Sequence, residues 1–286
     1  MEIISNASEP AIEDLVEKAK MGNKDVLEEI VRRIQDKIYG IAIRMLFIPA
    51  DAEDATQEIL VKVITHLSTF KGESRFDTWV YRIASNHLLT MRKYRAERWE
   101  LTFEKTEQSI EEAVHDDGAF VEAEQSLIIE ETRLACIHYM LLCLTREHRL
   151  AVILGELCNV DSIEGGKIMG LTPVAFRQRL SRGRKQLLHY MAKDCSLVNP
   201  ANPCHCDKLA AYHVKKKHID PHNLLFATHP CRPRRDSQAE EFLKELDQME
   251  RAAAIIRNHP DYAAPGVFVE SMRSLIDSGR FRLLEM

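Results

Sequence analysis

Apolar residues return at every third or fourth position along much of this chain, and this spacing is the feature that most limits its fold. The spacing first runs from Ile12 to Phe47, as two successive helices with apolar faces. It returns from Leu127 to Leu144 and continues from Ala151 to Leu157. Because such spacing is typical of amphipathic helices, we expect an all-α protein.

Start and stop signals divide the first part of the chain into four helices. Pro49 ends the first helical pair, Asp51 is placed to cap a third helix, and Asp77 is placed to cap a fourth. The third helix carries acidic residues in its first turns, whereas the fourth ends in a basic run. We therefore expect one small helical domain over residues 8–97.

The rest of the chain divides into three parts. Residues 98–125 are rich in acidic residues with few basic ones, which predicts an acidic flexible linker. In residues 126–192, we expect a short helix to begin at Asp161 and a turn at Gly170. Thr172 is placed to cap a long basic helix after that turn, which gives a helix-turn-helix pattern. Residues 193–286 form a C-terminal extension that is first rich in Pro, Cys and His and then mainly helical.

The overall composition predicts a folded, soluble protein of the cytoplasm. Apolar residues make up 45% of the chain, yet no stretch approaches the roughly 20 apolar residues of a membrane span, and the N-terminus has no secretory pattern. The net charge of -5 does not itself indicate nucleic-acid binding, so local basic patches decide that question. The odd count of seven cysteines argues against a disulfide framework.

Three segments together carry a family resemblance: DAEDATQEILVKV at residues 51–63, FKGESRFDTWVYRIASNHLLTMRKYR at residues 70–95, and FRQRLSRGRKQL at residues 176–187. They resemble the second and fourth conserved regions of bacterial sigma factors of the extracytoplasmic-function type, over roughly residues 10–192. The resemblance implies a non-enzymatic protein, with no required cofactor, that docks on core RNA polymerase, recognises and melts promoter DNA, and initiates transcription. An anti-sigma protein is a further partner that it leaves open.

The resemblance assigns polymerase docking to the acidic third helix. The docking residues it implies are Asp51, Glu53, Asp54, Gln57 and Glu58. Carboxylates suit a basic helical partner, although a solvated helix face with charges that favour its N-terminus is the plain alternative. The acidic linker is assigned to the RNA-exit path of the polymerase, with a disordered tether as the alternative.

The loop and helix that follow are assigned to the melted non-template strand. The residues implied are Phe70, Lys71, Ser74, Arg75, Arg82, Asn86, Arg92, Lys93 and Arg95. Flipping a base costs about a few kcal/mol, so stacking, polar contacts to its edge and phosphate neutralisation must compensate. We expect Asn86 to contact the flipped base and the arginines and lysines to bind phosphates. Trp79 is expected to pack in the core of the domain. Phe70 has the alternative of a simple loop anchor.

The long basic helix is assigned to the upstream promoter element in the major groove. Arg177, Gln178, Arg179, Ser181 and Arg182 are the candidates for bases, and Arg184 and Lys185 for phosphates. Gly165 and Gly166 depart from the family pattern, and each weakens a helix by about 1 kcal/mol relative to alanine, so we expect a loose first helix. The alternative function is a helix-turn-helix regulator with a metal- or redox-sensing C-terminal module, which binds duplex DNA without polymerase.

The C-terminal extension has the atoms of a metal site. Cys195, Cys204, Cys206 and Cys231, with histidines between them, suit zinc or copper(I). Redox sensing at Cys204 and Cys206 and a purely structural module are the alternatives. A tail helix from Glu240 to Ile256 is placed to regulate in cis by covering a DNA- or polymerase-binding surface. We find no nucleophile with a base at usable spacing, no phosphate-binding glycine loop and no HExxH pair, so the sequence predicts no enzyme.

Overall fold

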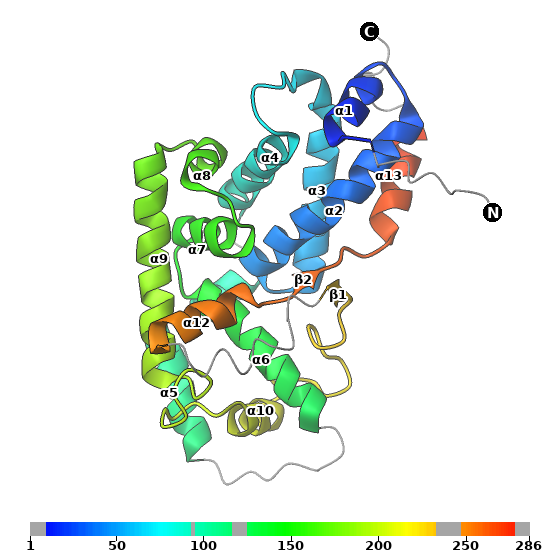
Figure 1. Ribbon diagram of the computed structural model, residues 1–286. Helices are drawn as coiled ribbons and strands as arrows, with labels where there is room; N and C mark the ends of the chain where they lie inside the picture. Colours follow the sequence, from blue (N-terminus) through cyan, green and yellow to red (C-terminus); the bar gives the residue numbers. More distant parts are fainter. Residues whose placement is uncertain (1–9, 93–94, 116–124, 233–246, 278–286) are drawn as a thin grey trace, which may run out of the picture.

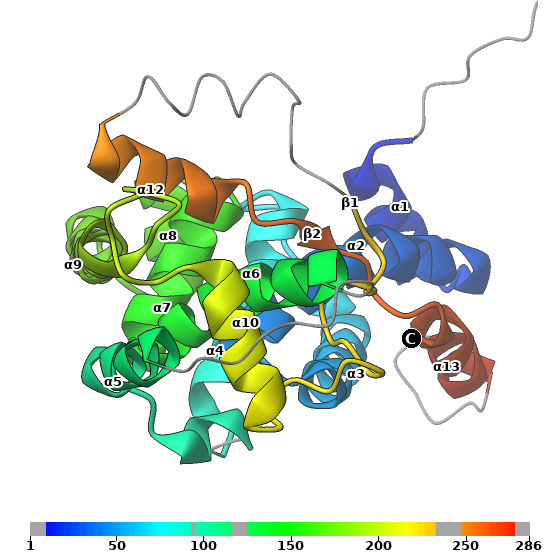
Figure 2. The same ribbon diagram turned by 90° about the horizontal axis from the view of Figure 1, so that it is seen from below.

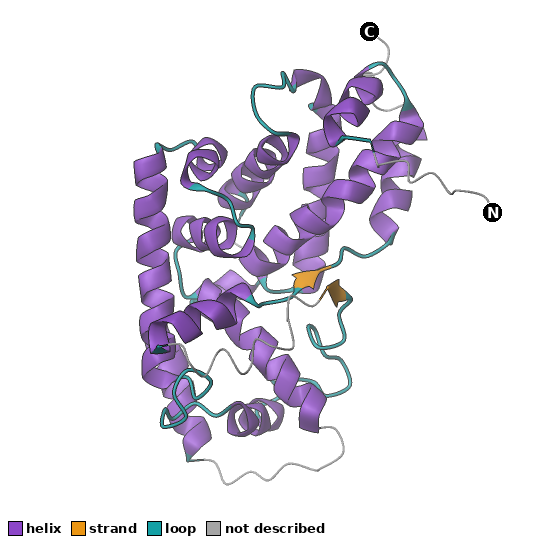
Figure 3. Cartoon of the chain, viewed as in Figure 1, coloured by secondary structure: helices purple, strands orange, loops and turns teal. Residues whose placement is uncertain are grey.

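The computed structural model describes residues 10–92, 95–115, 125–232 and 247–277. Nearly all the regular secondary structure of this part of the chain is helical, which confirms the all-α class (Figure 3). Its sheet consists of two antiparallel strands of two residues, β1 (Cys231–Arg232) and β2 (Asp261–Tyr262). None of the described helices has the length and apolar composition needed to cross a membrane.

The first group of helices is built around α2. It comprises α1 (Ile12–Lys20), α2 (Lys24–Leu46), α3 (Pro49–Thr65), the 3₁₀ turn η1 (Leu67–Thr69) and α4 (Phe76–Thr90). Asn23 caps α2 by accepting a hydrogen bond from the Val26 N–H at 3.3 Å. Every residue from Ile38 to Leu46 is buried, so this half of α2 is enclosed on all sides.

The second group contains the helix-turn-helix. It comprises α6 (Gln125–Leu142), α7 (Arg146–Val152), the π-helical turn η3 (Ile153–Leu157), α8 (Ser162–Met169) and α9 (Pro173–Asp194). The Asp161 carboxylate caps α8 by accepting from the N–H groups of Ile163 and Glu164, at 2.7 and 2.9 Å. Gly170, with a φ of 65°, makes the turn into α9 in a left-handed conformation that glycine adopts without cost.

The two glycines of α8 have a packing role that the sequence did not reveal. A Cβ atom on Gly165 would lie 2.4 Å from the Phe176 ring, and one on Gly166 would lie 2.8 Å from the Leu171 carbonyl oxygen. Both glycines are buried, and α8 is a regular helix with a capped start. The loose helix that we expected is therefore replaced by one that packs unusually close to α9.

The segment expected as a flexible linker is folded over its first half. It contains the 3₁₀ turn η2 (Ala96–Trp99) and α5 (Phe103–Val114), which Thr102 caps. The Glu107 carboxylate of α5 lies 2.9 Å from the Lys193 ammonium, and Glu112 accepts a hydrogen bond from Tyr212 at 2.5 Å. The acidic residues of this segment are thus partly matched by basic and polar groups of α9 and the extension. Residues 116–124 lie outside the described residues.

The C-terminal extension contacts both helical groups (Figures 1 and 2). Helix α10 (Cys206–Lys215) packs on α5 and α6, α12 (Gln248–Arg257) on α9 and η3, and α13 (Val267–Asp277) on α2. The Arg257 guanidinium lies 2.8 Å from the Glu156 carboxylate, and the Ala264 N–H donates to Asp36 at 2.9 Å. The expected tail helix corresponds to α12 in its described part, since residues 233–246 lie outside that part.

The two groups share one hydrophobic core. Helix α4 packs against α8, and α2 packs against α6 and α7 (Figure 1). Buried Arg149 of α7 donates to the Met45 carbonyl of α2 at 2.6 Å and to the Leu141 carbonyl at 2.9 Å. Burial lowers the pKa of Arg149 to about 10. The two domains expected to be joined by a tether are therefore packed together.

Candidate nucleic-acid and polymerase interface

The acidic face of α3 presents three of its five expected docking residues. Asp54, Gln57 and Glu58 are exposed, Glu53 is half-buried, and Asp51 is buried. Residues three and four apart lie on the same face of a helix, so the three exposed side chains form one polar surface. Asp51 instead accepts a hydrogen bond from the Arg95 Nε at 2.9 Å. Two residues assigned to different surfaces thus pair with each other and tie α3 to the segment before η2.

The loop before α4 is anchored by Phe70. This side chain is 5% exposed, and its ring lies 5.3 Å from that of Phe76 and 5.5 Å from that of Trp79. Lys20 donates to the Phe70 carbonyl at 2.7 Å and lies over the Phe70 ring. This geometry favours the loop-anchor alternative for Phe70. Trp79 packs against the core, as expected.

The remaining residues assigned to melted DNA lie on the loop before α4, along α4 and just after it. Lys71, Arg75, Arg82, Asn86 and Arg92 are exposed and Ser74 is half-buried, while Lys93 lies outside the described residues. Arg82 and Asn86 are one turn apart on the outer face of α4. Behind them, His87 is buried, with its ring nitrogen 2.6 Å from the Lys62 ammonium. Burial and this ammonium lower the pKa of His87, so a neutral ring backs this face.

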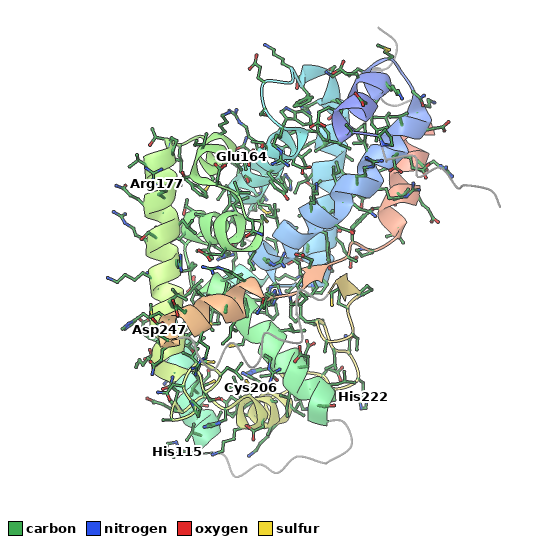
Figure 4. All side chains as sticks on the ribbon, viewed as in Figure 1. His115, Glu164, Arg177, Cys206, His222 and Asp247 are labelled. Atoms are coloured by element: carbon green, nitrogen blue, oxygen red, sulfur yellow. The ribbon has the colours of Figure 1, made fainter. Side chains whose placement is uncertain are left out.

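Helix α9 presents a basic face from its N-terminal half. Arg177, Gln178, Ser181, Arg182 and Lys185 are exposed, and Arg179 and Arg184 are half-buried. At about 100° per residue the five exposed side chains fall within an arc of roughly 140°. Arg177 lies near the start of the helix and donates to Ser162 at 3.0 Å (Figure 4). Arg184 lies 3.4 Å from Glu156, so its charge is already matched within the chain.

Comparison with known proteins finds similar sequences among sigma factors. The sigma-70 region 2 model matches residues 30–100, which include α3, the anchored loop and α4. The chain is 28% identical over 189 residues to the ECF RNA polymerase sigma factor SigW of Bacillus subtilis, covering 63% of this chain and 96% of that protein. It is also 28% identical to the ECF RNA polymerase sigma-E factor of Escherichia coli K12, over 60% of this chain and 90% of that protein.

Over about 60% of its length, the chain is thus similar to RNA polymerase sigma factors of the extracytoplasmic-function type. A third relative, SigE of Mycolicibacterium smegmatis, is 31% identical over 59% of this chain and 63% of its own length. The solved structure of CnrH in complex with the cytosolic domain of CnrY matches 62% of this chain and 94% of that chain, at 22% identity and a TM-score of 0.44.

The two parts of the chain that the sequence assigned to DNA contact each other directly. Thr78 of α4 donates to the Glu164 carboxylate of α8 at 3.2 Å (Figure 4). Asp77, next to Thr78, lies 2.6 Å from the Lys37 ammonium of α2. The first helix of the helix-turn-helix therefore rests on the helix assigned to melting, and the sequence contained no signal for this contact.

The cysteines of the extension divide into two places. Cys195 and Cys204 are paired by an isolated β-bridge, and Cys206 follows two residues later at the start of α10. Cys231 lies in β1 and is exposed, where burial and the Glu130 carboxylate raise its pKa. Burial first, and the Cys204 thiol second, raise the pKa of Cys136 on α6, whose helical setting is typical of a small buried apolar residue. As the side chains stand, no three potential ligands in the described part are placed to hold a metal ion.

Proposed function

We propose that this sigma factor docks on core RNA polymerase through the exposed acidic face of α3 and directs promoter-specific initiation in the cytoplasm. The observation that carries the proposal is the coincidence of the region 2 match with a surface-exposed set of Asp54, Gln57 and Glu58. Charges at the rim of an interface set partner choice and association rate. The relatives are named as sigma factors, which act as initiation factors rather than enzymes.

Promoter melting is the proposed task of α4 and its preceding loop. Lys71 and Arg75 are exposed on a loop that Phe70 anchors, and Arg82 and Asn86 continue this polar surface along α4. Cationic side chains can hold the phosphates of the displaced strand, and an amide can contact a base edge. The exposed face of α9 is proposed to read the upstream element, because arginine and glutamine pair with guanine and adenine edges.

Helix α8 rests on α4, so the closed arrangement fixes the position of the α4 surface relative to the basic face of α9. We infer that polymerase binding stabilises an open arrangement, in which region 2 and the helix-turn-helix occupy different sites. An anti-sigma protein that stabilises the closed arrangement stays a prediction of the family resemblance.

Transcription with purified components tests the proposal. Core RNA polymerase, the full chain and a library of genomic fragments should give promoter-specific run-off transcripts. Asp54→Lys should reduce the affinity for core polymerase at least tenfold, whereas Asp25→Lys, an exposed charge reversal on α2, should leave it unchanged. Duplex binding by the chain alone, with no transcripts in the presence of polymerase, would support the helix-turn-helix regulator instead.

A further inference from the structure

Two arginines of α7 lie where three other helices end. Arg146 and Arg149 are three positions apart on α7, which contacts α2, α4 and α6 (Figure 1). The last carbonyls of a helix have no partner within the helix and carry partial negative charge, so guanidinium groups stabilise such ends. The Glu97 carboxylate of η2 accepts hydrogen bonds from both arginines. We call these three side chains the α7 clasp.

Arg146 joins α7 to the first helical group. Its guanidinium donates to the Met91 carbonyl at 2.7 Å and to the carbonyls of Leu89 and Arg92 at 3.2 Å. It also donates to both Glu97 oxygens, from Nε at 2.8 Å and from a terminal nitrogen. These acceptors lie at the end of α4, just after it or in η2. Each of these bonds therefore connects the second group to the segment that ends the first.

Arg149 sits in the same place with its charge removed from water. Its side chain is 4% exposed and lies 3.3 Å from a Glu97 oxygen. Its guanidinium donates to the Met45 carbonyl of α2 at 2.6 Å. Its remaining acceptors are carbonyls at or just after the end of α6, those of Leu141, Leu142 and Leu144. Burial lowers the pKa of Arg149 to about 10, so its desolvation opposes the closed arrangement, and Glu97 offsets part of that effect.

The clasp thus contains one contribution that favours the closed arrangement and one that opposes it. If the two groups separate, Arg149 keeps its acceptors on the second group, loses Met45 and regains water. The carbonyls at the end of α4 also regain water, so separation leaves neither set of groups buried and unpaired. Opposed contributions leave a small difference in free energy, which a partner that binds the open arrangement can overcome.

We propose that Arg146, Arg149 and Glu97 set how often the free chain opens, and thereby its affinity for core RNA polymerase. This inference rests on the proposed function, in which polymerase stabilises an open arrangement. When the state that binds a partner is a minor one, the apparent affinity is reduced by its fraction. Weakening the clasp should therefore strengthen polymerase binding, whereas losing a docking contact weakens it.

Energy transfer in the free chain tests the clasp without polymerase. With fluorescent probes at exposed Arg82 of α4 and Lys167 of α8, Arg146→Gln and Glu97→Gln should each lower the transfer. Glu97→Gln should lower it more, because it leaves the buried guanidinium of α7 without a counter-charge. Unchanged transfer in Arg146→Gln, with its helical content retained, would overturn the proposal.

A matched arginine variant and a milder substitution separate opening from misfolding. Arg32→Gln removes ion pairs to Glu28 and Glu29 that lie within α2, so it should leave the transfer unchanged. Arg146→Lys keeps the charge but not the fork that reaches several acceptors, so it should lower the transfer less than Arg146→Gln. Circular dichroism should show the same helical content in all variants. Loss of helical content in every clasp variant would overturn the proposal, because the clasp would then hold the fold of each group.

Polymerase binding separates failure of the clasp from failure of the proposed docking surface. Arg146→Gln should bind core polymerase roughly tenfold more tightly than the unmodified chain. Lower transfer in this variant with unchanged affinity would overturn the proposed link to polymerase. Tighter binding by Arg146→Gln, with no loss of affinity in Asp54→Lys, would support the clasp and contradict docking through α3.

Discussion

At the scale of single residues, burial distinguishes side chains that the sequence grouped together. Asp51 and Asp54 are three positions apart in one acidic segment, yet Asp51 is 4% exposed and paired with Arg95, whereas Asp54 is exposed. Phe70 and Lys71 are neighbours in one loop, yet Phe70 packs in an aromatic cluster and Lys71 faces solvent. Charge and family position selected these residues, but only packing tells which of them can reach a partner.

Phe70→Ala should destabilise the first helical group rather than act on DNA alone. Removing a buried aromatic ring costs about 3–5 kcal/mol of unfolding free energy, because the site beside Phe76 and Trp79 cannot collapse fully. Urea unfolding followed by circular dichroism measures this loss. Lys71→Ala in the same loop should leave stability within about 0.5 kcal/mol. Equal stability of the two variants would show that Phe70 is free to serve DNA.

His213 should make stability depend on pH. Burial first, and nearby His218 second, lower its pKa from 6.5 to about 4. Below about pH 6.5 the unfolded chain takes up a proton that the folded chain resists, so the unfolding free energy falls as the pH falls from 6.5 toward 4. At pH 5 the loss from this group is about 2 kcal/mol.

The variant His213→Gln isolates this contribution. Its unfolding free energy should fall less between pH 7.5 and pH 5 than that of the unmodified chain, by about the same 2 kcal/mol. Denaturant unfolding at both pH values provides the comparison. An identical pH dependence in the two proteins would show that the proton is taken up elsewhere.

At the scale of helices, the close contact between α8 and α9 determines how substitution of the α8 glycines changes the unfolding free energy. Gly165→Ala should lower the unfolding free energy by about 1–3 kcal/mol, because its Cβ would meet the Phe176 ring. Helix propensity alone predicts the opposite, a gain of about 1 kcal/mol. Lys167→Ala, at an exposed position of the same helix, serves as the control in thermal unfolding. A stabilised Gly165→Ala variant would mean that α8 is as loose as its sequence suggested.

The sequence predicted the positions of the helices better than it predicted which parts of the chain pack against them. The predicted caps at Thr145, Asp161 and Thr172 are confirmed. The predicted caps at Asp51 and Asp77 are wrong, because Pro49 and Phe76 already begin these helices after Ile48 and Arg75. Helix α5 was missed because its acidic composition resembles a tether, and its partner groups on α9 and α10 are distant in the sequence. The metal site expected at Cys195, Cys204, Cys206 and Cys231 stays a prediction, since in the described part of the chain no three potential ligands are placed to hold a metal ion.

At the scale of the whole molecule, the extension fastens the two helical groups together. Helix α12 packs on the second group, where Arg257 pairs with Glu156, and α13 packs on the first group, where Arg273 lies 2.5 Å from Glu28. Between them, the Arg44 guanidinium of α2 donates to the Pro260 carbonyl at 2.6 Å. The segment from α12 to α13 thus spans both groups, and the closed arrangement depends on it as well as on the contact between α4 and α8.

Core polymerase should separate α4 from α8. Fluorescent probes at Arg82 and Lys167, introduced through unnatural amino acids because the chain has seven cysteines, would report their distance by energy transfer. Transfer should be high in the free chain and should fall when polymerase is added. A control pair at Lys37 and Arg82, both in the first group, should keep its transfer. Unchanged transfer in an initiating complex would contradict opening.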